Sequence, residues 1–343
     1  MTAHWMKEVT QRARTGPLAD ATQAIWQALG RSPASPSQRG AHTEGGLTRS
    51  CLLYLPPDAG PSGTPMPLVV MLHGCTQDAA DFALGTGMNT LAREQGFAVL
   101  YPEQSSDANP QRCWSWFQPS HQMRGQGEPA VLAGMTRAVT AQHGLDARRV
   151  YVAGLSAGGA MAAVLGQAYP DIYAAVGIHS GLASGVANDL MSALSAMKNG
   201  PEEHAVAPSA SCCGEPSDAA LGAAGWQTPL PTIVFHGDGD EIVHPGNGSQ
   251  AISMALGDRH AHDECQAEAP VIEQGASPQG RRYTRTIYPS PTGSTPHAEH
   301  WVVHGGGHAW SGGCAQGSYT DPSGPDATRE MWRFFSHHGR PGP

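Results

Sequence analysis

The chain alternates short apolar runs with stretches of helical period, and this alternation constrains its fold more than any other feature. The runs are Leu68–Leu72, Phe97–Tyr101, Val150–Ala153, Ala174–Ile178, Thr232–Phe235 and His300–Val303. Continuous apolar runs of this length are typical of strands buried on both faces, as in a parallel sheet. The stretches between them, such as Glu128–Gln142 and Ala157–Tyr169, have the period and length of helices. Repeated strand–helix units predict an α/β fold with a doubly wound, mostly parallel sheet.

The chain of 343 residues is long enough for one large catalytic domain with a sizeable core. We expect residues 1–46 to be an N-terminal helical segment followed by a polar linker, and residues 47–343 to be the catalytic domain. Residues 182–230 are rich in Ala, Ser, Gly and Pro and are predicted to form a cap or lid over the sheet. Residues 258–298 are expected to be irregular, around one possible strand at Tyr283–Tyr288.

A serine flanked by glycines follows one of the apolar runs. The segment Gly154-Leu-Ser156-Ala-Gly158 lies between the strand expected at Val150–Ala153 and a predicted helix. In a G-x-S-x-G elbow the glycines let the backbone pack closely around a strained serine, whose hydroxyl is exposed at the carboxyl edge of the sheet. Ser156 is therefore the candidate nucleophile for acyl transfer.

A serine nucleophile needs a base, and the base needs an orienting carboxylate, which in this fold class follow the serine in the order acid, then histidine. The strand expected at Thr232–Phe235 is followed by three carboxylates. Asp240 is the preferred acid because it lies beyond a glycine turn, where a loop can aim it across the sheet edge. Asp238 is the second choice, and Glu241 is expected to face solvent.

The candidate base follows the last apolar run. Three glycines separate His304 from His308, and they would let the loop curl so that the His308 ring reaches the serine. We therefore predict that His308 is the general base. His304 lies at the end of the strand and is expected to be packed.

A second strand end supplies the expected oxyanion hole. The run Leu68–Leu72 ends in His73-Gly74-Cys75, and the backbone N–H of Cys75 is the best candidate donor beside that of Ala157. Cys75 and Cys113 each lie beside an expected active-site segment. A disulfide between them would brace the oxyanion loop.

Two aromatic segments are candidates for the substrate-binding wall. Trp310 lies two residues beyond His308 and is expected to line the pocket. Trp114, in the Trp114–Phe117 cluster, is expected to form another wall. An ordinary aromatic core patch is an equal alternative for that cluster.

The charge balance narrows the class of partner. The net charge is −9, and the chain has only two lysines and no run of basic residues, which argues against a nucleic-acid partner. No apolar stretch approaches the roughly 18 residues that span a bilayer, and no secretion signal is seen. The expected compartment is the cytoplasm, with secretion as the alternative if a leader is missing. The expected partner is a small-molecule or oligomeric ester, and the oligomeric state is not predicted.

No metal or organic cofactor is expected. None of the seven cysteines has the paired C-x-x-C spacing of a zinc site. The ligand types between Asp258 and Cys265 are spaced irregularly in a polar segment, so a metal site there is disfavoured.

With these segments placed, the chain resembles the poly(3-hydroxybutyrate) depolymerase family of esterases, within the α/β-hydrolases. The matching stretches are LHGCTQDAADFA, YPEQSSDANPQRCWSWF, RGQGEPA, RVYVAGLSAGGAMAAVLGQAYPDIYAAVGIHSGLA, IVFHGDGDEIVHP and GGGHAWSGG with GSYTDPSGPDATREMWRFF. The resemblance implies that Ser156 is the nucleophile, that His308 is the base and that Asp240, rather than Asp238, orients it. It also implies hydrolysis of hydroxyalkanoate polymer or oligomer esters, such as those of 3-hydroxybutyrate.

The sequence leaves other functions open. Members that degrade extracellular polymer carry a secretion signal and a separate binding domain, and neither is seen here, which favours soluble oligomers or small esters. The alternative within enzymes is a feruloyl, acetyl-xylan or general short-chain carboxylesterase. A non-catalytic binding protein that has kept a hydrolase fold is a further alternative, but the intact Ser, Asp and His argue against it.

Overall fold

The structure is a computed structural model that describes residues 37–57, 64–201, 229–257, 269–290 and 293–341. The predicted N-terminal helix and most of the predicted cap, residues 202–228, lie outside these ranges. So does the cluster of ligand types between Asp258 and Cys265.

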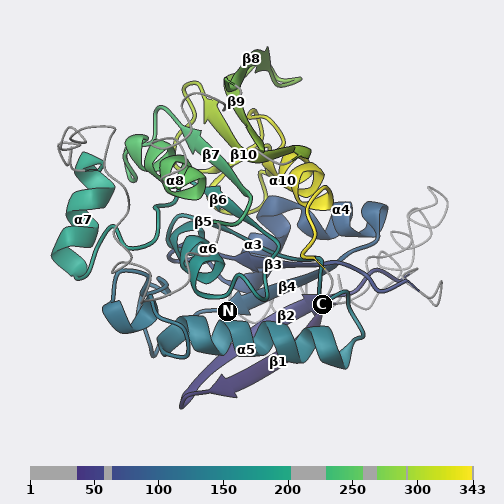
Figure 1. Cartoon of the computed structure of the whole chain (residues 1–343). Coiled ribbons are helices and arrows are strands. Elements are labelled where there is room, and N and C mark those ends of the chain that lie inside the picture. The colour runs from purple at the N-terminus through teal and green to yellow at the C-terminus, as the bar shows by residue number, and fades with distance from the viewer. Residues whose placement is uncertain (1–36, 58–63, 202–228, 258–268, 291–292, 342–343) are drawn as a thin grey trace, which may run out of the picture. The chain divides into compact units, whose positions relative to one another are not determined.

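The described strands form one ten-stranded sheet in the order β1-β2-β4-β3-β5-β6-β7-β10-β9-β8 (Figure 1). Its strands are β1 (Gln38–Glu44), β2 (Leu47–Tyr54), β3 (Leu68–Leu72), β4 (Ala98–Glu103), β5 (Val150–Leu155), β6 (Ala175–His179), β7 (Thr232–Gly237), β8 (Val271–Ala276), β9 (Arg282–Ser290) and β10 (Gly293–Val303). The pairs from β4 through β3, β5, β6 and β7 to β10 are all parallel. The strands outside them pair antiparallel. Each of the predicted apolar runs lies on a central parallel strand, and the predicted α/β class is confirmed.

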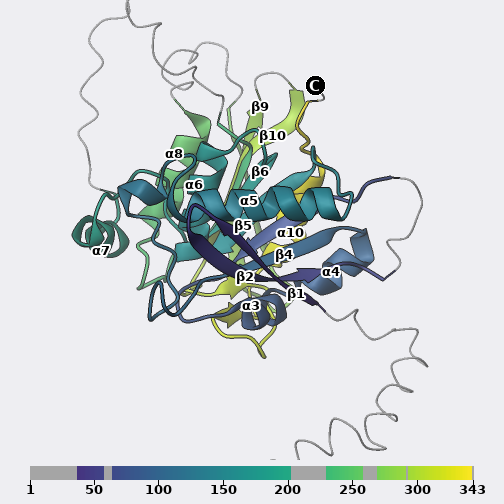
Figure 2. The same cartoon turned by 90° about the horizontal axis from the view of Figure 1, so that it is seen from below.

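Helices cover both faces of this sheet. They are α3 (Ala79–Thr86), α4 (Met88–Gln95), the short 3₁₀ helix η1 (Pro119–His121), α5 (Gly127–Gln142), α6 (Ala157–Ala168), α7 (Leu190–Asn199), α8 (Gly246–Leu256) and α10 (Ala327–Ser336). One apolar core cluster joins α5, α6 and α8 to the sheet, and a second joins α3, α4 and α10 to its other face. In both views α5 runs along β1 and β2 (Figures 1 and 2). No helix in the described ranges is long and apolar enough to cross a membrane.

The predicted linker ends earlier than expected. Residues 38–44 form strand β1, which pairs with β2 along its whole length. The side chains of β1 are mostly exposed, because it is an edge strand whose main chain supplies the pairing. Without a buried face β1 has no apolar alternation, so the sequence pattern does not predict a strand there.

The region expected to be irregular, residues 258–298, is largely regular where the structure describes it. There β8, β9 and the first part of β10 form an antiparallel extension of the sheet. The side chains of β8 are almost all exposed and those of β9 are half-buried. Strands of this kind lack the continuous apolar runs of the central parallel strands, so the sequence pattern predicts only the one at Tyr283–Tyr288.

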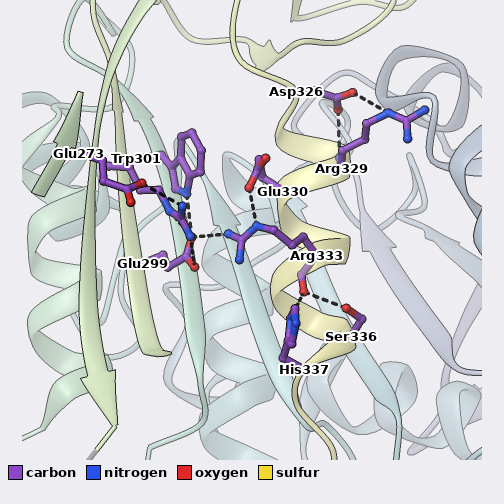
Figure 3. Close-up of polar contacts among 10 residues, drawn as sticks. Glu273, Glu299, Trp301, Asp326, Arg329, Glu330, Arg333, Ser336 and His337 are labelled. Carbon is purple, nitrogen blue, oxygen red and sulfur yellow. Dashed lines mark hydrogen bonds and ion pairs between the residues drawn. The ribbon is translucent and has the colours of Figure 1, made fainter. Parts of the chain in front are cut away.

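A buried carboxylate ties this extension to α10 (Figure 3). Glu299 on β10 is fully buried and accepts hydrogen bonds from Arg285 Nη2 on β9 at 2.8 Å and Arg333 Nη2 on α10 at 2.6 Å. It also accepts one from Trp301 Nε1 at 3.1 Å. Burial alone would raise the pKa of Glu299, but the two guanidinium groups hold that pKa below its usual range. The carboxylate is therefore a charged cross-link between the sheet extension and the C-terminal helix.

Candidate active site

Ser156 lies in a strained turn between β5 and α6. Its backbone has φ 58° and ψ −121°, a left-handed φ that a residue with a Cβ rarely adopts. Its N–H donates to the backbone oxygen of His179 at 2.9 Å, which fixes the turn against the end of β6. The serine is 8% exposed, at the carboxyl edge of the parallel strands, as the elbow pattern predicts.

The glycines around the serine are required by close backbone contacts. A Cβ on Gly154 would lie 2.3 Å from the backbone oxygen of Gly158. A Cβ on Gly158 would lie 2.1 Å from the backbone oxygen of Leu72 at the end of β3. Neither distance is possible between non-bonded atoms, so any side chain at these positions would push α6 away from the sheet. The elbow therefore depends on both glycines for steric reasons.

The acid and the base preferred from sequence are brought together. His308 Nδ1 lies 2.7 Å from Asp240 Oδ2. A carboxylate only accepts hydrogen bonds, so Nδ1 carries the proton and Nε2 is left free to act as a base. The side chain of Asp240 is fully buried and that of His308 is 7% exposed.

Asp240 accepts hydrogen bonds from other donors besides His308. Its Oδ1 accepts the backbone N–H groups of Ile242 and Val243, each at 2.9 Å. The Nε2 of His236 donates to the Val243 oxygen and lies 3.4 Å from Asp240 Oδ2. Burial would raise the pKa of Asp240, but the hydrogen bonds from His236 and His308 hold that pKa well below its usual range. The carboxylate is thus charged and oriented.

Ser156 and His308 line one pocket of about 380 Å³. No hydrogen bond joins the two side chains in the part of the chain that the structure describes. Such bonds are often long in a free enzyme and tighten when substrate binds. The nucleophile and the base therefore share a cavity, with the base already oriented by its carboxylate.

Aromatic and aliphatic side chains form most of the pocket wall. Trp114, Trp116 and Phe117 all line it, so the aromatic cluster serves as a wall rather than as core alone. Helix α7, which lies in the described part of the predicted cap, adds Leu190, Ala193, Leu194 and Met197. Among the described residues no Asp, Glu, Lys or Arg side chain lines this pocket.

Trp310 does not line the pocket, which corrects the expectation from its position near His308. It is fully buried and its ring packs on Phe82 and His179. Its Nε1 donates to Thr328 Oγ1 of α10 at 3.0 Å. The short strand β11 (Trp310–Ser311) pairs with β12 (Thr320–Asp321) and turns the indole into the core.

The two residues expected to supply the oxyanion donors, Cys75 and Ala157, line the same pocket as Ser156. Ala157 is the first residue of α6, where a backbone N–H has no partner within its helix. Cys75 lines the same pocket, and the structure joins it to Cys113 by a disulfide. No acceptor for the backbone N–H of Cys75 is found among the described residues. Two N–H groups can therefore face the oxygen of a bound ester.

Asp238 pairs with a different histidine. Its Oδ2 accepts from His304 Nδ1 at 2.8 Å, and its Oδ1 accepts the backbone N–H of Gly305. His304 Nε2 lies 2.9 Å from Thr284 Oγ1. The side chain of His304 is 34% exposed, so it is less packed than expected. Glu241 is exposed, as predicted.

Two residues that shape the site were not recognised from sequence. His236, the second histidine near Asp240, comes directly after the strand expected at Thr232–Phe235 and lies on the observed strand β7. Gln77 fixes the loop after β3 by accepting the N–H of Gly74 at 3.0 Å. Its place three residues after that glycine was the only signal. No group of three or more potential metal ligands occurs within the described ranges.

The sequence matches the family described as Esterase PHB depolymerase over residues 49–267. It is 34% identical over 251 residues to poly(3-hydroxyalkanoate) depolymerase C of Paucimonas lemoignei, covering 72% of this chain and 56% of that protein. It is 31% identical over 190 residues to feruloyl esterase B of Thermothelomyces thermophilus, covering 55% and 64%. The chain thus spans just over half of the first relative and less than two thirds of the second.

The fold is also similar to a solved structure, an acetyl xylan esterase from Aspergillus awamori. The match has a TM-score of 0.60 and 18% identity, and it covers 88% of this chain and 99% of that one. At this identity the likeness shows the fold alone. Together with the parallel sheet and the serine elbow, it identifies the α/β-hydrolase fold.

Proposed function

The chain belongs to the PHB depolymerase family of esterases, and from this premise we propose that it hydrolyses carboxylic esters by acyl transfer through Ser156, His308 and Asp240. The observation that carries the proposal is the strained Ser156 in the pocket that also holds His308, whose other ring nitrogen is bound to Asp240. This is the arrangement that serine acyl transfer needs.

The reaction has two steps. In the first, Ser156 Oγ attacks the ester carbonyl while His308 Nε2 takes its proton, and the N–H groups of Cys75 and Ala157 stabilise the oxyanion. His308 then gives the proton to the leaving alcohol, and an acyl-serine remains. In the second step water attacks this acyl-enzyme with His308 again as the base, and the acid product leaves. Asp240 holds the imidazole orientation and stabilises its charged form throughout.

The substrate proposed first is an ester of a hydroxyalkanoate, such as a 3-hydroxybutyrate oligomer or polymer, and a small or oligomeric ester is the expected partner. The relative from Paucimonas lemoignei, a poly(3-hydroxyalkanoate) depolymerase, supports this class. The uncharged wall of the pocket supports a neutral substrate, since a charged one would be desolvated without a partner.

A feruloyl or acetyl-xylan ester is the second candidate, and the identity to feruloyl esterase B favours it. Phe117, the least buried of the three aromatic side chains that line the pocket, could contact an aromatic acyl group. Measured kcat/KM values for hydroxybutyrate oligomers, methyl ferulate and acetylated xylan separate the two. A preference for the oligomers of tenfold or more supports the first candidate, and the reverse preference supports the second.

The test of the catalytic proposal is Ser156→Ala. We expect the hydrolysis of p-nitrophenyl butyrate to fall by about 10⁴-fold or more, because the remaining groups cannot replace the nucleophile. A fluorophosphonate should label the wild-type chain at Ser156 and leave the variant unlabelled. If the variant kept more than a trace of turnover, or if the label lay elsewhere, the assignment would be wrong.

We also propose that the chain functions in an oxidising compartment, which revises the cytoplasmic expectation. The disulfide between Cys75 and Cys113 supports this, because such bonds persist where thiols are not kept reduced. Mass spectrometry of the unreduced protein from its native source tests it. Two free thiols at these positions would return the cytoplasm as the expected compartment.

A further inference from the structure

We propose that His73 is a positioning residue, which fixes the Gly74–Cys75 peptide so that the Cys75 N–H faces the reacting carbonyl. The inference rests on the proposed esterase function, because it concerns the oxyanion hole of the same site. His73 follows strand β3 and is fully buried, and it does not line the pocket. It therefore acts through its neighbours rather than on the substrate.

The two ring nitrogens of His73 have different and defined partners. The backbone N–H of Gln104 donates to Nε2 at 3.1 Å, so Nε2 carries no proton. The proton is then on Nδ1, which lies 2.8 Å from the backbone oxygen of Gly74 and donates to it. Burial lowers the pKa of His73 and keeps the ring neutral, so this tautomer persists at neutral pH.

The shorter bond to the Gly74 oxygen, from His73, helps to set where the next N–H points. No cis peptide bond occurs in the described chain, so the Gly74–Cys75 peptide is trans. In a trans peptide the C=O and the N–H lie in one plane and point in opposite directions. The Gln77 N–H also donates to the Gly74 oxygen, at 3.4 Å. Because the His73 ring and this second, longer bond hold the Gly74 oxygen on one side, the Cys75 N–H is turned to the other side.

The peptide before Gly74 is held as well. Trp114 Nε1 donates to the backbone oxygen of His73 at 3.0 Å, and the N–H of Gly74 donates to Gln77 Oε1 at 3.0 Å. Gln77 is itself anchored through Nε2, at 3.1 Å from both the Ser318 oxygen and Asp81 Oδ2. Both planes that flank Gly74 are therefore fixed.

This fixed segment lies beside the nucleophile. A Cβ on Gly74 would be 3.6 Å from the Cβ of Ser156 and 3.4 Å from the oxygen of Leu155. The His73 oxygen, the Gly74 N–H and the Gly74 oxygen each have a hydrogen-bond partner. The Cys75 N–H, the next polar backbone group, has no acceptor among the described residues. A donor that is oriented before substrate binds needs no reorganisation during the reaction, and this is the source of its catalytic effect.

His73 is thus distinct from a catalytic base. Neither ring nitrogen is free to take a proton from Ser156, because one already accepts a hydrogen bond and the other is a donor. A purely structural role for the ring would depend on its volume and on its bond to Gln104. The positioning role depends on the Nδ1 donor.

Two variants separate these roles. In His73→Asn the side-chain amide can occupy the place of Nδ1 and still donate to the Gly74 oxygen, but it does not reach the Gln104 N–H. In His73→Gln the amide reaches the place of Nε2 and loses the Nδ1 donor. We expect kcat to fall about 10²- to 10³-fold in His73→Gln, the cost of one oxyanion donor, and less than about 10-fold in His73→Asn.

Three further measurements make the comparison decisive. KM for p-nitrophenyl butyrate should change little in either variant, while the affinity for an alkyl boronic acid should fall in parallel with kcat. The boronate binds Ser156 as a tetrahedral adduct, so its oxygen tests the oxyanion hole directly. If neither variant folds, ¹⁵N NMR of the wild-type His73 ring still tests the inference: a neutral Nδ1–H tautomer at neutral pH supports it.

Equal losses of kcat in the two variants, or better activity in His73→Gln, would overturn the positioning role. So would an Nε2–H tautomer of His73 in the wild type. Failure of the proposed esterase function has a different signature. In that case the wild-type chain itself would show no hydrolysis dependent on Ser156, whatever the behaviour of His73.

Discussion

Two aspartate–histidine pairs join the same two loops, the one after β7 and the one after β10. Asp240 and His308 lie 2.7 Å apart, and Asp238 and His304 lie 2.8 Å apart. In both pairs the aspartate accepts a hydrogen bond from Nδ1 of the histidine. In both, burial raises the pKa of the aspartate, but the bond from the histidine helps to hold that pKa below its usual range. The surroundings differ: the side chains of the first pair are 0% and 7% exposed, and those of the second are 43% and 34% exposed.

The second ring nitrogen also has a different partner in each pair. His304 Nε2 meets the Thr284 hydroxyl on β9, whereas His308 lines the pocket that contains Ser156. The hydrogen bond between Asp and His is therefore common to both and does not by itself make a catalytic site. What distinguishes the first pair is its burial and the strained serine beside it.

The largest expected effect comes from the buried pair. In Asp240→Asn the amide favours the wrong tautomer of His308, which then cannot take the proton of Ser156. We expect kcat for p-nitrophenyl butyrate to fall about 10⁴-fold with little change in KM. Thermal unfolding of the variant is the control. A folded variant that retained a tenth of the wild-type kcat would show that Asp240 does not orient the base.

Glu299, the carboxylate bound by two arginines, is as buried as Asp240 but does not line the pocket. It therefore separates the effect of burial from the effect of a place in the active site. Glu299→Gln leaves Arg285 and Arg333 without their buried counter-charge. We expect the free energy of unfolding to fall by about 3 kcal/mol, and kcat of the folded fraction to stay within about twofold. Glu273→Gln is the matched control, since Glu273 contacts the same Arg285 but is half-exposed, and it should cost less than about 1 kcal/mol.

The effect of Glu299→Gln depends on pH in a defined direction. The folded pKa of Glu299 is lowered, so its contribution to stability is fully present above the unfolded pKa of about 4.3. It is lost as the pH falls through the lower folded pKa. The stability difference between wild type and variant should therefore be constant near pH 7 and narrow below about pH 4. A difference that widens in acid would contradict the charged cross-link.

The sequence predicts the parallel core and the serine elbow because each leaves a recognisable residue pattern. Central strands are apolar on both faces, and the elbow needs glycine for steric reasons, so Gly154 and Gly158 leave a clear pattern. The edge strands β1 and β8 are mostly exposed and leave no such pattern. Trp310 was misplaced because sequence distance from His308 does not tell which way a side chain turns.

The exposed pair gives the smallest expected effect and the sharpest test of the comparison. Backbone bonds from the Asp238 N–H to the Val303 oxygen, at 3.1 Å, and from the Gly239 N–H to the Gly306 oxygen, at 3.0 Å, join the two loops without any side chain. In Asp238→Asn the amide oxygen can still accept the N–H of Gly305. We therefore expect kcat to change less than about threefold and stability by at most about 1 kcal/mol, since solvent screens the pair. If Asp238→Asn reduced kcat as much as Asp240→Asn, then Asp238, the second choice for the acid in the sequence analysis, would share the catalytic role. Burial would then no longer explain the difference between the two pairs.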